Sequence, residues 1–182
     1  MKTKFILIRH GRTQWNREDK YLSYTDIDMD EYGVGQIKET AKSINLDEID
    51  AVYSSDLRRA VHTAEIIFKK REIVKKPELR EMNFGVFEGL THEEILEKYS
   101  EVYTRWLNDP YSIRIPNGDY LPEYIERVCN CMSAIASENK GCAIAVTAHA
   151  GPIRVILNKI SNQKNFWGTL PPSGSVHVVE YE

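Results

Sequence analysis

Short apolar segments alternate with amphipathic helical patterns from one end of this chain to the other. The apolar runs lie at residues 5–8, 51–53, 142–146 and 176–179, and we predict each as a β-strand. Helical spacing of apolar residues occupies residues 33–44, 56–70, 91–98 and 121–139. The runs at 5–8 and 142–146 are apolar without interruption, which is typical of parallel strands covered on both faces. The alternation therefore predicts an α/β fold, a three-layer sandwich with a mostly parallel sheet and helices on both faces.

Capping residues indicate where two of these helices begin. Asp56 is placed to cap the helix at residues 56–70, because a carboxylate at this position accepts hydrogen bonds from the free N–H groups of the first turn. Thr91 and Glu94 have the spacing of a capping box, in which each side chain bonds the backbone N–H of the other residue. We expect the helix that starts there to end near Lys98.

The stretch from residue 81 to residue 120 interrupts the alternation of strands and helices. It is rich in tyrosine and also contains Trp106. Ligands of open parallel sheets bind outside the carboxyl ends of the strands. We therefore expect residues 81–120 to form a small cap over such a site, within a single domain that spans residues 1–182.

Composition limits the classes of partner and the location. The chain has 182 residues and a net charge of −3, which provides no general attraction to nucleic acid or to an anionic membrane. Three cysteines cannot all pair with one another, and the apolar run at residues 5–8 is too short for a signal peptide or a membrane span. We expect a cytoplasmic protein. Cys129 and Cys131 stand two positions apart on a predicted helix and point to different faces, so no metal site is expected there.

Several polar residues follow predicted strands or open predicted helices. Arg9 and His10 end the first strand, Arg59 lies in the first turn of a helix, and His149 follows the strand at residues 142–146. A histidine at a buried strand end can be neutral at physiological pH and can act as a nucleophile toward phosphorus. The planar guanidinium of Arg9 suits the oxygens of a phosphate group. Glu81 adds a carboxyl group. Together these residues favour a site for a phosphorylated ligand.

The same residues resemble, in order and approximate spacing, the motifs of the histidine phosphatase superfamily, which includes the cofactor-dependent phosphoglycerate mutases. The matching blocks are Arg9-His10-Gly11 with Thr13, Trp15 and Asn16; Ser54-Ser55-Asp56-Leu57 with Arg59; Glu81 with Phe84-Gly85 and Glu88-Gly89; Pro116-Asn117-Gly118-Asp119; and His149 with Gly151 and Ile153-Arg154. The resemblance spans nearly the whole chain, from residue 9 to residue 154.

This resemblance implies a role for each site residue. His10 would attack phosphorus and become phosphohistidine, and Glu81 would protonate the departing alcohol and later take a proton from water. The expected ligands of the phosphoryl oxygens are Arg9, Arg59, His149 and Asn16. These groups stabilise charge and position the substrate without a metal ion or a cofactor. Ser23 and Ala150 stand where the family usually has glycine at the edge of the pocket, so we expect both to contact the substrate.

Three functions are compatible with such a site. A phosphatase would pass the phosphoryl group from His10 to water, a mutase would pass it to a hydroxyl of the bound substrate, and a non-catalytic module would only bind a phosphorylated ligand. A binding module needs neither a nucleophile nor an acid. Mutases of the family typically carry an arginine and a tyrosine where this chain has Met82 and Phe84. The sequence therefore favours a metal-independent hydrolase of phosphate monoesters.

The predicted cap bears on the substrate, which we expect to be a small-molecule phosphate ester. Residues 101–109 and 115–118 resemble the alpha-ribazole phosphatase branch of the family, whose members act in cobalamin nucleotide-loop assembly. An aromatic, acidic cover offers stacking faces to a nucleoside-like leaving group and repels highly charged sugar bisphosphates. A broad-specificity phosphatase with the same scaffold fits the sequence equally well.

Overall fold

The computed structural model of the chain describes residues 1–163, 165–168 and 170–181. The strands are β1 (Thr3–Arg9), β2 (Ala51–Ser54), β3 (Ile73–Lys75), β4 (Ala143–Ala148) and β5 (Val176–Tyr181). The α-helices are α1 (Gln14–Arg17), α2 (Glu31–Lys42), α3 (Arg58–Phe68), α4 (His92–Asn108), α5 (Leu121–Glu138) and α6 (Ala150–Ile160). Short 3₁₀ helices cover Leu46–Glu48, Pro77–Leu79 and Gly85–Phe87. Within the described ranges, no helix has both the length and the apolar character needed to cross a bilayer.

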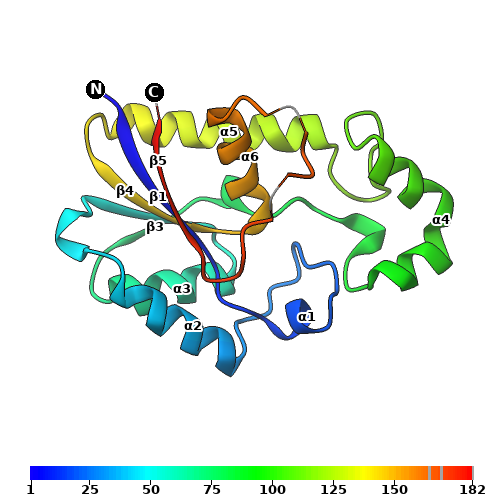
Figure 1. Ribbon diagram of the computed structural model, residues 1–182, viewed down its shortest axis with the longest axis horizontal. Coiled ribbons are helices and arrows are strands. Elements are labelled where there is room, and N and C mark those ends of the chain that lie inside the picture. Colours follow the sequence, from blue (N-terminus) through cyan, green and yellow to red (C-terminus); the bar gives the residue numbers. More distant parts are fainter. Residues whose placement is uncertain (164, 169, 182) are drawn as a thin grey trace.

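The described strands form one mixed sheet in the order β3-β2-β4-β1-β5. β1, β2, β3 and β4 run parallel, and β5 pairs antiparallel with β1 at one edge. Helices α2 and α3 cover one face of the sheet, and α5 and α6 cover the other (Figure 1). This arrangement confirms the predicted α/β sandwich with a mostly parallel sheet.

Strand β1 lies between β4 and β5 and sends successive side chains to opposite faces of the sheet. Phe5 and Leu7 join the apolar cluster that includes α5 and α6. Ile6 and Ile8 join the smaller cluster that includes α2 and α3. All four side chains are buried. Because β1 is covered on both faces, its carboxyl end is a rigid support for the residue that follows it, His10.

Two helices begin at residues other than those we predicted. Helix α2 starts at Glu31, because the Asp30 side chain caps it by accepting a hydrogen bond from the Gly33 N–H at 2.7 Å. The prediction that Asp56 caps α3 is wrong: the residue before the helix is Leu57, and no side chain caps it. The Asp56 carboxylate instead accepts a hydrogen bond from Nε of Arg80 at 2.7 Å.

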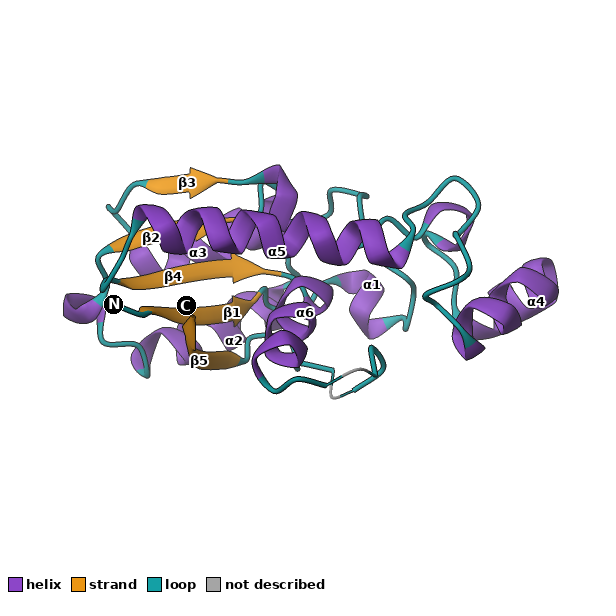
Figure 2. Ribbon diagram, turned by 90° about the horizontal axis from the view of Figure 1, so that it is seen from above, coloured by secondary structure: helices purple, strands orange, loops and turns teal. Residues whose placement is uncertain are grey.

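Helix α4 has the predicted start and extends further than predicted. The capping box is confirmed: the Thr91 N–H donates to the Glu94 carboxylate at 2.8 Å, and the Glu94 N–H donates to the Thr91 hydroxyl at 3.3 Å. The helix runs past Lys98 to Asn108, with a local departure from helical geometry at Tyr99. Both α4 and the short helix α1 lie beyond the carboxyl ends of the parallel strands (Figure 2).

Candidate active site

His10 follows β1 directly and is almost fully buried, with 3% of its surface exposed. Its Nδ1 lies 2.8 Å from the carbonyl oxygen of Gly11. A carbonyl can only accept, so Nδ1 carries the proton and Nε2 keeps a free lone pair. Burial, followed by the charges of Arg59 and Arg9, holds the pKa of His10 well below its usual range. His10 is therefore a neutral imidazole with Nε2 as its nucleophilic atom.

His149 stands at the equivalent point after β4, the parallel neighbour of β1. The register pairs Arg9 with Ala148, so the residues that follow the two strands lie side by side. The rings of His10 and His149 are 5.2 Å apart, centroid to centroid. Nε2 of His149 shares a hydrogen bond of 2.8 Å with the Ser55 hydroxyl, while its Nδ1 is buried and has no partner among the described residues. A ligand held beside His10 can use that nitrogen.

Buried Arg59 and partly buried Arg9 supply positive charge next to His10. The guanidinium of Arg59 donates to the carbonyl oxygens of Ser23 at 2.6 Å and Thr25 at 3.0 Å, and that of Arg9 donates to the carbonyl of Pro171 at 2.5 Å. Burial lowers the pKa of Arg59 to about 10 and also lowers the pKa of Arg9. Within the described part of the chain, neither guanidinium forms a salt bridge with a carboxylate. Two charges without direct counter-ions favour an anionic ligand.

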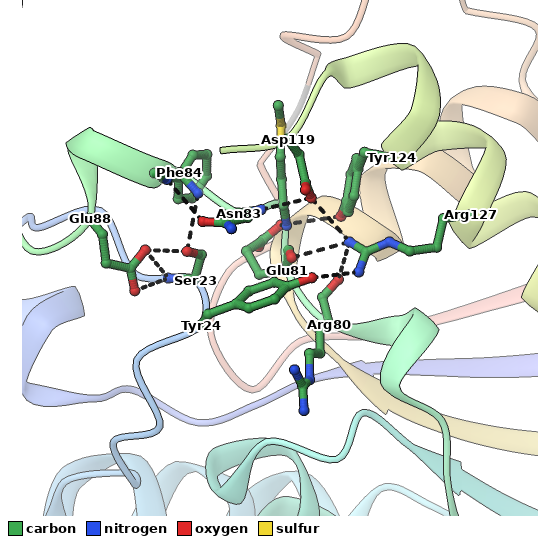
Figure 3. Close-up of polar contacts among 12 residues, drawn as sticks. Ser23, Tyr24, Arg80, Glu81, Asn83, Phe84, Glu88, Asp119, Tyr124 and Arg127 are labelled. Atoms are coloured by element: carbon green, nitrogen blue, oxygen red, sulfur yellow. Dashed lines mark hydrogen bonds and ion pairs between the residues drawn. The ribbon is translucent and has the colours of Figure 1, made fainter. Parts of the chain in front are cut away.

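Glu81 also lines the site and is 7% exposed. Its Oε2 accepts a hydrogen bond from the N–H of Gly151 at 2.9 Å. Its Oε1 accepts from the N–H of Met82 at 2.9 Å and from the Tyr124 hydroxyl at 3.2 Å. The carboxyl group is thus held in one orientation by the start of α6, by α5 and by its own backbone (Figure 3).

Arg9, His10 and Glu81 line one cavity of about 570 Å³. Polar residues that line it include Arg9, His10, Arg12, Asn16, Lys20, Glu81 and Arg154, and aromatic residues that line it are Tyr21, Phe84, Trp106, Phe166 and Trp167. Trp106 and Trp167 pack edge to face with ring centroids 4.9 Å apart. No three histidine, cysteine, aspartate or glutamate side chains of the described ranges cluster closely enough to hold a metal ion.

Most of the predicted site residues meet at this cavity. Arg9, His10, Asn16, Glu81 and Ala150 line it. The Asn16 side-chain oxygen accepts bonds from Thr13, which leaves its NH₂ group without a hydrogen bond among the described residues and able to donate to a ligand. Arg59 and His149 are buried around His10 and are not part of the cavity lining.

Ser23, which we expected to contact the substrate, does not line the cavity. Its side chain is fully buried, and its hydroxyl donates to the Glu88 carboxylate (Figure 3). The same carboxylate accepts the backbone N–H groups of Ser23 and Thr25, at 2.9 Å and 3.0 Å. Since the carbonyls of these two residues hold Arg59, Ser23 and Glu88 support the position of the arginine.

Sequence reasoning missed three contributors to the site. Arg154 is only 8% exposed, its Nε has no partner in the described ranges, and its guanidinium lies 5.2 Å from the ring centroid of Phe166. Its position five residues after His149 on a helix was the available signal. The contact of Tyr124 with Glu81 and the place of Trp167 beside Trp106 depend on tertiary packing and leave no local pattern.

Comparison with known proteins identifies the family of the chain. The model of the histidine phosphatase superfamily (branch 1) matches residues 5–182. The chain is 28% identical to phosphoserine phosphatase 1 of Hydrogenobacter thermophilus, over 98% of this chain and 87% of that protein. It is 32% identical to a metal-independent phosphoserine phosphatase of Arabidopsis thaliana, over 97% of this chain and 76% of that protein.

Solved structures of phosphatases have the same fold as this chain. The alpha-ribazole phosphatase of Shigella flexneri superposes with a TM-score of 0.87 at 25% identity, covering 96% of this chain and 89% of that one. A phosphoserine phosphatase of Entamoeba histolytica, solved with 3-phosphoglyceric acid, also superposes with a TM-score of 0.87 at 25% identity, covering 97% and 89%. The chain belongs to the histidine phosphatase superfamily, branch 1.

Proposed function

We propose that this protein hydrolyses small phosphate monoesters through a phosphohistidine formed at Nε2 of His10. The observation that carries the proposal is the convergence of three unlike groups at one cavity. They are a neutral imidazole with a free Nε2, the guanidinium of Arg9, which has no carboxylate partner among the described residues and is reinforced by Arg59 buried behind the lining, and the oriented carboxyl of Glu81. Phosphoryl transfer asks a protein mainly for positioning and for charge stabilisation, and these groups provide both.

The reaction has two steps. In the first, Nε2 of His10 forms a bond to phosphorus as the bond from phosphorus to the ester oxygen breaks, and Glu81 gives its proton to the departing alcohol. In the second, the Glu81 carboxylate takes a proton from water as the water oxygen attacks phosphorus and releases His10. The positive charges of Arg9 and Arg59, together with donors from His149 and Asn16, stabilise the phosphoryl oxygens throughout.

Hydrolysis is favoured over mutase activity by the residues near Glu81. A phosphoglycerate mutase holds a carboxylate as well as a phosphate and retains its intermediate away from water. Met82 and Phe84 stand where mutases of the family typically carry an arginine and a tyrosine, so a substrate carboxylate has to pair with a cation elsewhere in the lining, such as Arg154. A site that only binds its ligand has no use for a nucleophile and an acid at the same cavity, which disfavours the non-catalytic alternative.

The aromatic residues of the cavity lining favour a substrate whose leaving group has a flat, weakly polar face. Tyr21, Phe84 and Trp106 line it, and they pack edge to face on one another. Alpha-ribazole 5′-phosphate has such a leaving group, and the similarity to the Shigella flexneri enzyme supports the same substrate. A broad-specificity phosphatase would use the same wall with less selectivity.

Arg154 favours a second candidate, a phosphatase for esters that also carry a carboxylate, as phosphoserine does. It is a nearly buried cation in the cavity wall with no ion pair among the described residues. A carboxylate of the leaving group can pair with it, and a buried charge without a partner is costly. Two of the relatives compared above are phosphoserine phosphatases.

A substrate panel separates these candidates. We would compare kcat/KM for alpha-ribazole 5′-phosphate, phosphoserine, simple sugar phosphates and 3-phosphoglycerate with the purified protein. A preference of more than about tenfold for one ester, equivalent to ~1.4 kcal/mol of transition-state binding, identifies the substrate class. Uniform rates indicate broad specificity. Efficient interconversion of 2- and 3-phosphoglycerate, or no turnover of any ester, would overturn the proposal of a phosphatase.

An Arg154→Met variant sharpens the comparison. Methionine keeps the apolar stem of the side chain and removes the charge. If Arg154 pairs with a carboxylate of the substrate, kcat/KM for phosphoserine falls by about 10-fold or more, since hydrogen bonds to charged groups contribute ~1.5–3 kcal/mol. The rate for p-nitrophenyl phosphate, which has no carboxylate, stays within about twofold of the unmodified protein. Equal losses for both esters exclude the pairing.

A further inference from the structure

The two oxygens of the Glu81 carboxyl have different surroundings. Oε1 accepts two hydrogen bonds, from the Met82 N–H at 2.9 Å and from the Tyr124 hydroxyl at 3.2 Å. Oε2 accepts one, from the Gly151 N–H at 2.9 Å. Each carboxylate oxygen has two lone pairs in its plane. Oε1 therefore has no lone pair left for a proton, whereas Oε2 retains one.

The Tyr124 hydroxyl is the one side-chain donor to Glu81 among the described residues, and it is fixed in place. Tyr124 is 1% exposed, and the Arg127 guanidinium lies over its ring at 5.1 Å from the centroid. Nη2 of Arg127 is itself within hydrogen-bond distance of the carbonyls of Arg80 and Glu81, at 3.4 Å and 3.3 Å, and of the Asp119 carboxylate at 3.4 Å (Figure 3). These contacts hold Tyr124 against the backbone segment that carries Glu81.

The start of α6 lies close to both Tyr124 and Glu81. A methyl group built on Gly151 would lie 2.5 Å from the Tyr124 hydroxyl and 2.0 Å from Oε1 of Glu81, so glycine is the residue that leaves room for both groups. Burial and the neighbouring Glu81 charge keep the pKa of Tyr124 well above its usual value. The phenol is thus a neutral O–H donor at physiological pH.

We propose that Tyr124 is a positioning residue that directs the transferable proton of Glu81 to Oε2. The inference rests on the proposed function, in which Glu81 is the general acid. During phosphorylation of His10, the O–H bond at Oε2 breaks as the proton passes to the ester oxygen, while Oε1 keeps both of its hydrogen bonds. Without the phenol, Oε1 gains an open lone pair, and the proton has a second place to reside.

The test is a Tyr124→Phe variant assayed with two esters of different leaving groups. We would measure kcat/KM, because this ratio reports the phosphorylation step even where hydrolysis of the phosphohistidine limits kcat. An alkyl phosphate needs its leaving oxygen protonated, and p-nitrophenyl phosphate barely does. We expect kcat/KM to fall about 10-fold for the alkyl ester and less than about twofold for the aryl ester. The alkyl loss is smaller than the ~10²–10⁴ expected for removal of a general acid, because the acid is still present.

A matched control is Tyr24→Phe. The Tyr24 hydroxyl accepts a hydrogen bond from Nη1 of Arg127 at 2.9 Å, so it belongs to the same polar network, yet it has no hydrogen bond to Glu81 among the described residues (Figure 3). This variant should change kcat/KM for both esters by less than about twofold. Removal of the Tyr124 oxygen leaves Glu81 with two backbone donors, so Tyr124→Phe is compatible with the fold, and thermal unfolding verifies this.

Two outcomes would overturn the inference: an equal loss for both esters, which indicates a general structural role, or an unchanged rate for the alkyl ester. A parallel Glu81→Gln variant distinguishes failure of the inference from failure of the proposed function. If Glu81→Gln slows both esters equally, the acid role itself is wrong. If Glu81→Gln slows the alkyl ester selectively and Tyr124→Phe does not, only the role of Tyr124 is wrong.

Discussion

Substitution of Gly151 by alanine is a sharp test of how closely Glu81 is held. A Cβ at this position would lie 2.0 Å from Oε1 of Glu81 and 2.5 Å from the Tyr124 hydroxyl. Real Cβ atoms essentially never approach closer than 3.0 Å, so the carboxyl must move by about 1 Å. Displacement of a reacting group by 1 Å costs about 10²-fold in rate. We therefore expect kcat/KM for an alkyl phosphate to fall about 100-fold.

The substitution should also lower the stability of the protein. Gly151 is the second residue of α6, where alanine is favoured over glycine by up to ~1 kcal/mol. Overpacking opposes this by ~1–3 kcal/mol, so the free energy of unfolding should fall by no more than about 3 kcal/mol in a urea titration. Gly35→Ala is the control: Gly35 lies on α2 with nothing within 4 Å of the added methyl group, and this change should leave kinetics intact. Alkyl ester activity of Gly151→Ala within threefold of the unmodified protein would refute the reasoning.

Two further predictions follow from the site. The low pKa values of His10 and His149 require both imidazoles to stay neutral at pH 5.5, which ¹⁵N NMR of the imidazole nitrogens measures; midpoints near 6.5 would contradict the burial argument. The unfolded chain takes up those protons below about pH 6.5, so the free energy of unfolding should decrease as pH falls through that value. Glu88→Gln weakens the charge-assisted hydrogen bonds to the Ser23–Thr25 segment, so the free energy of unfolding should fall by about 2–3 kcal/mol in a urea titration. Because Arg59 is then less well held, inorganic phosphate should inhibit the variant several-fold more weakly. Unchanged inhibition by phosphate would show that Glu88 does not help to hold Arg59 in position.

Much of the fold was predictable because it is set by local patterns. Uninterrupted apolar runs located β1 and β4, and helical spacing located α5. Strand β3 (Ile73–Lys75) was not predicted, since three residues at the sheet edge carry too short a pattern. Asp56 was misassigned as a helix cap because its partner, Arg80, lies 24 positions away.

The same distinction applies to the candidate site. His10 and His149 were predictable because each directly follows a buried strand, and the two strands are parallel neighbours. The role of Ser23 was not, since it depends on Glu88, 65 positions further along the chain. The contact of Tyr124 with Glu81 likewise spans 43 positions. Contacts of this range arise from the packed structure and have no counterpart in local spacing.

The central claim, covalent transfer of the phosphoryl group to His10, is tested most directly by trapping the intermediate. Rapid acid-free quenching with ³²P-labelled substrate, followed by peptide mapping, should place acid-labile and base-stable label on the peptide that contains His10. His10→Ala should give no label and essentially no turnover. His62→Ala should label normally, because His62 pairs with Asp28 at 3.0 Å and does not line the cavity. Label on any other residue, or turnover by His10→Ala at the unmodified rate, would contradict the account.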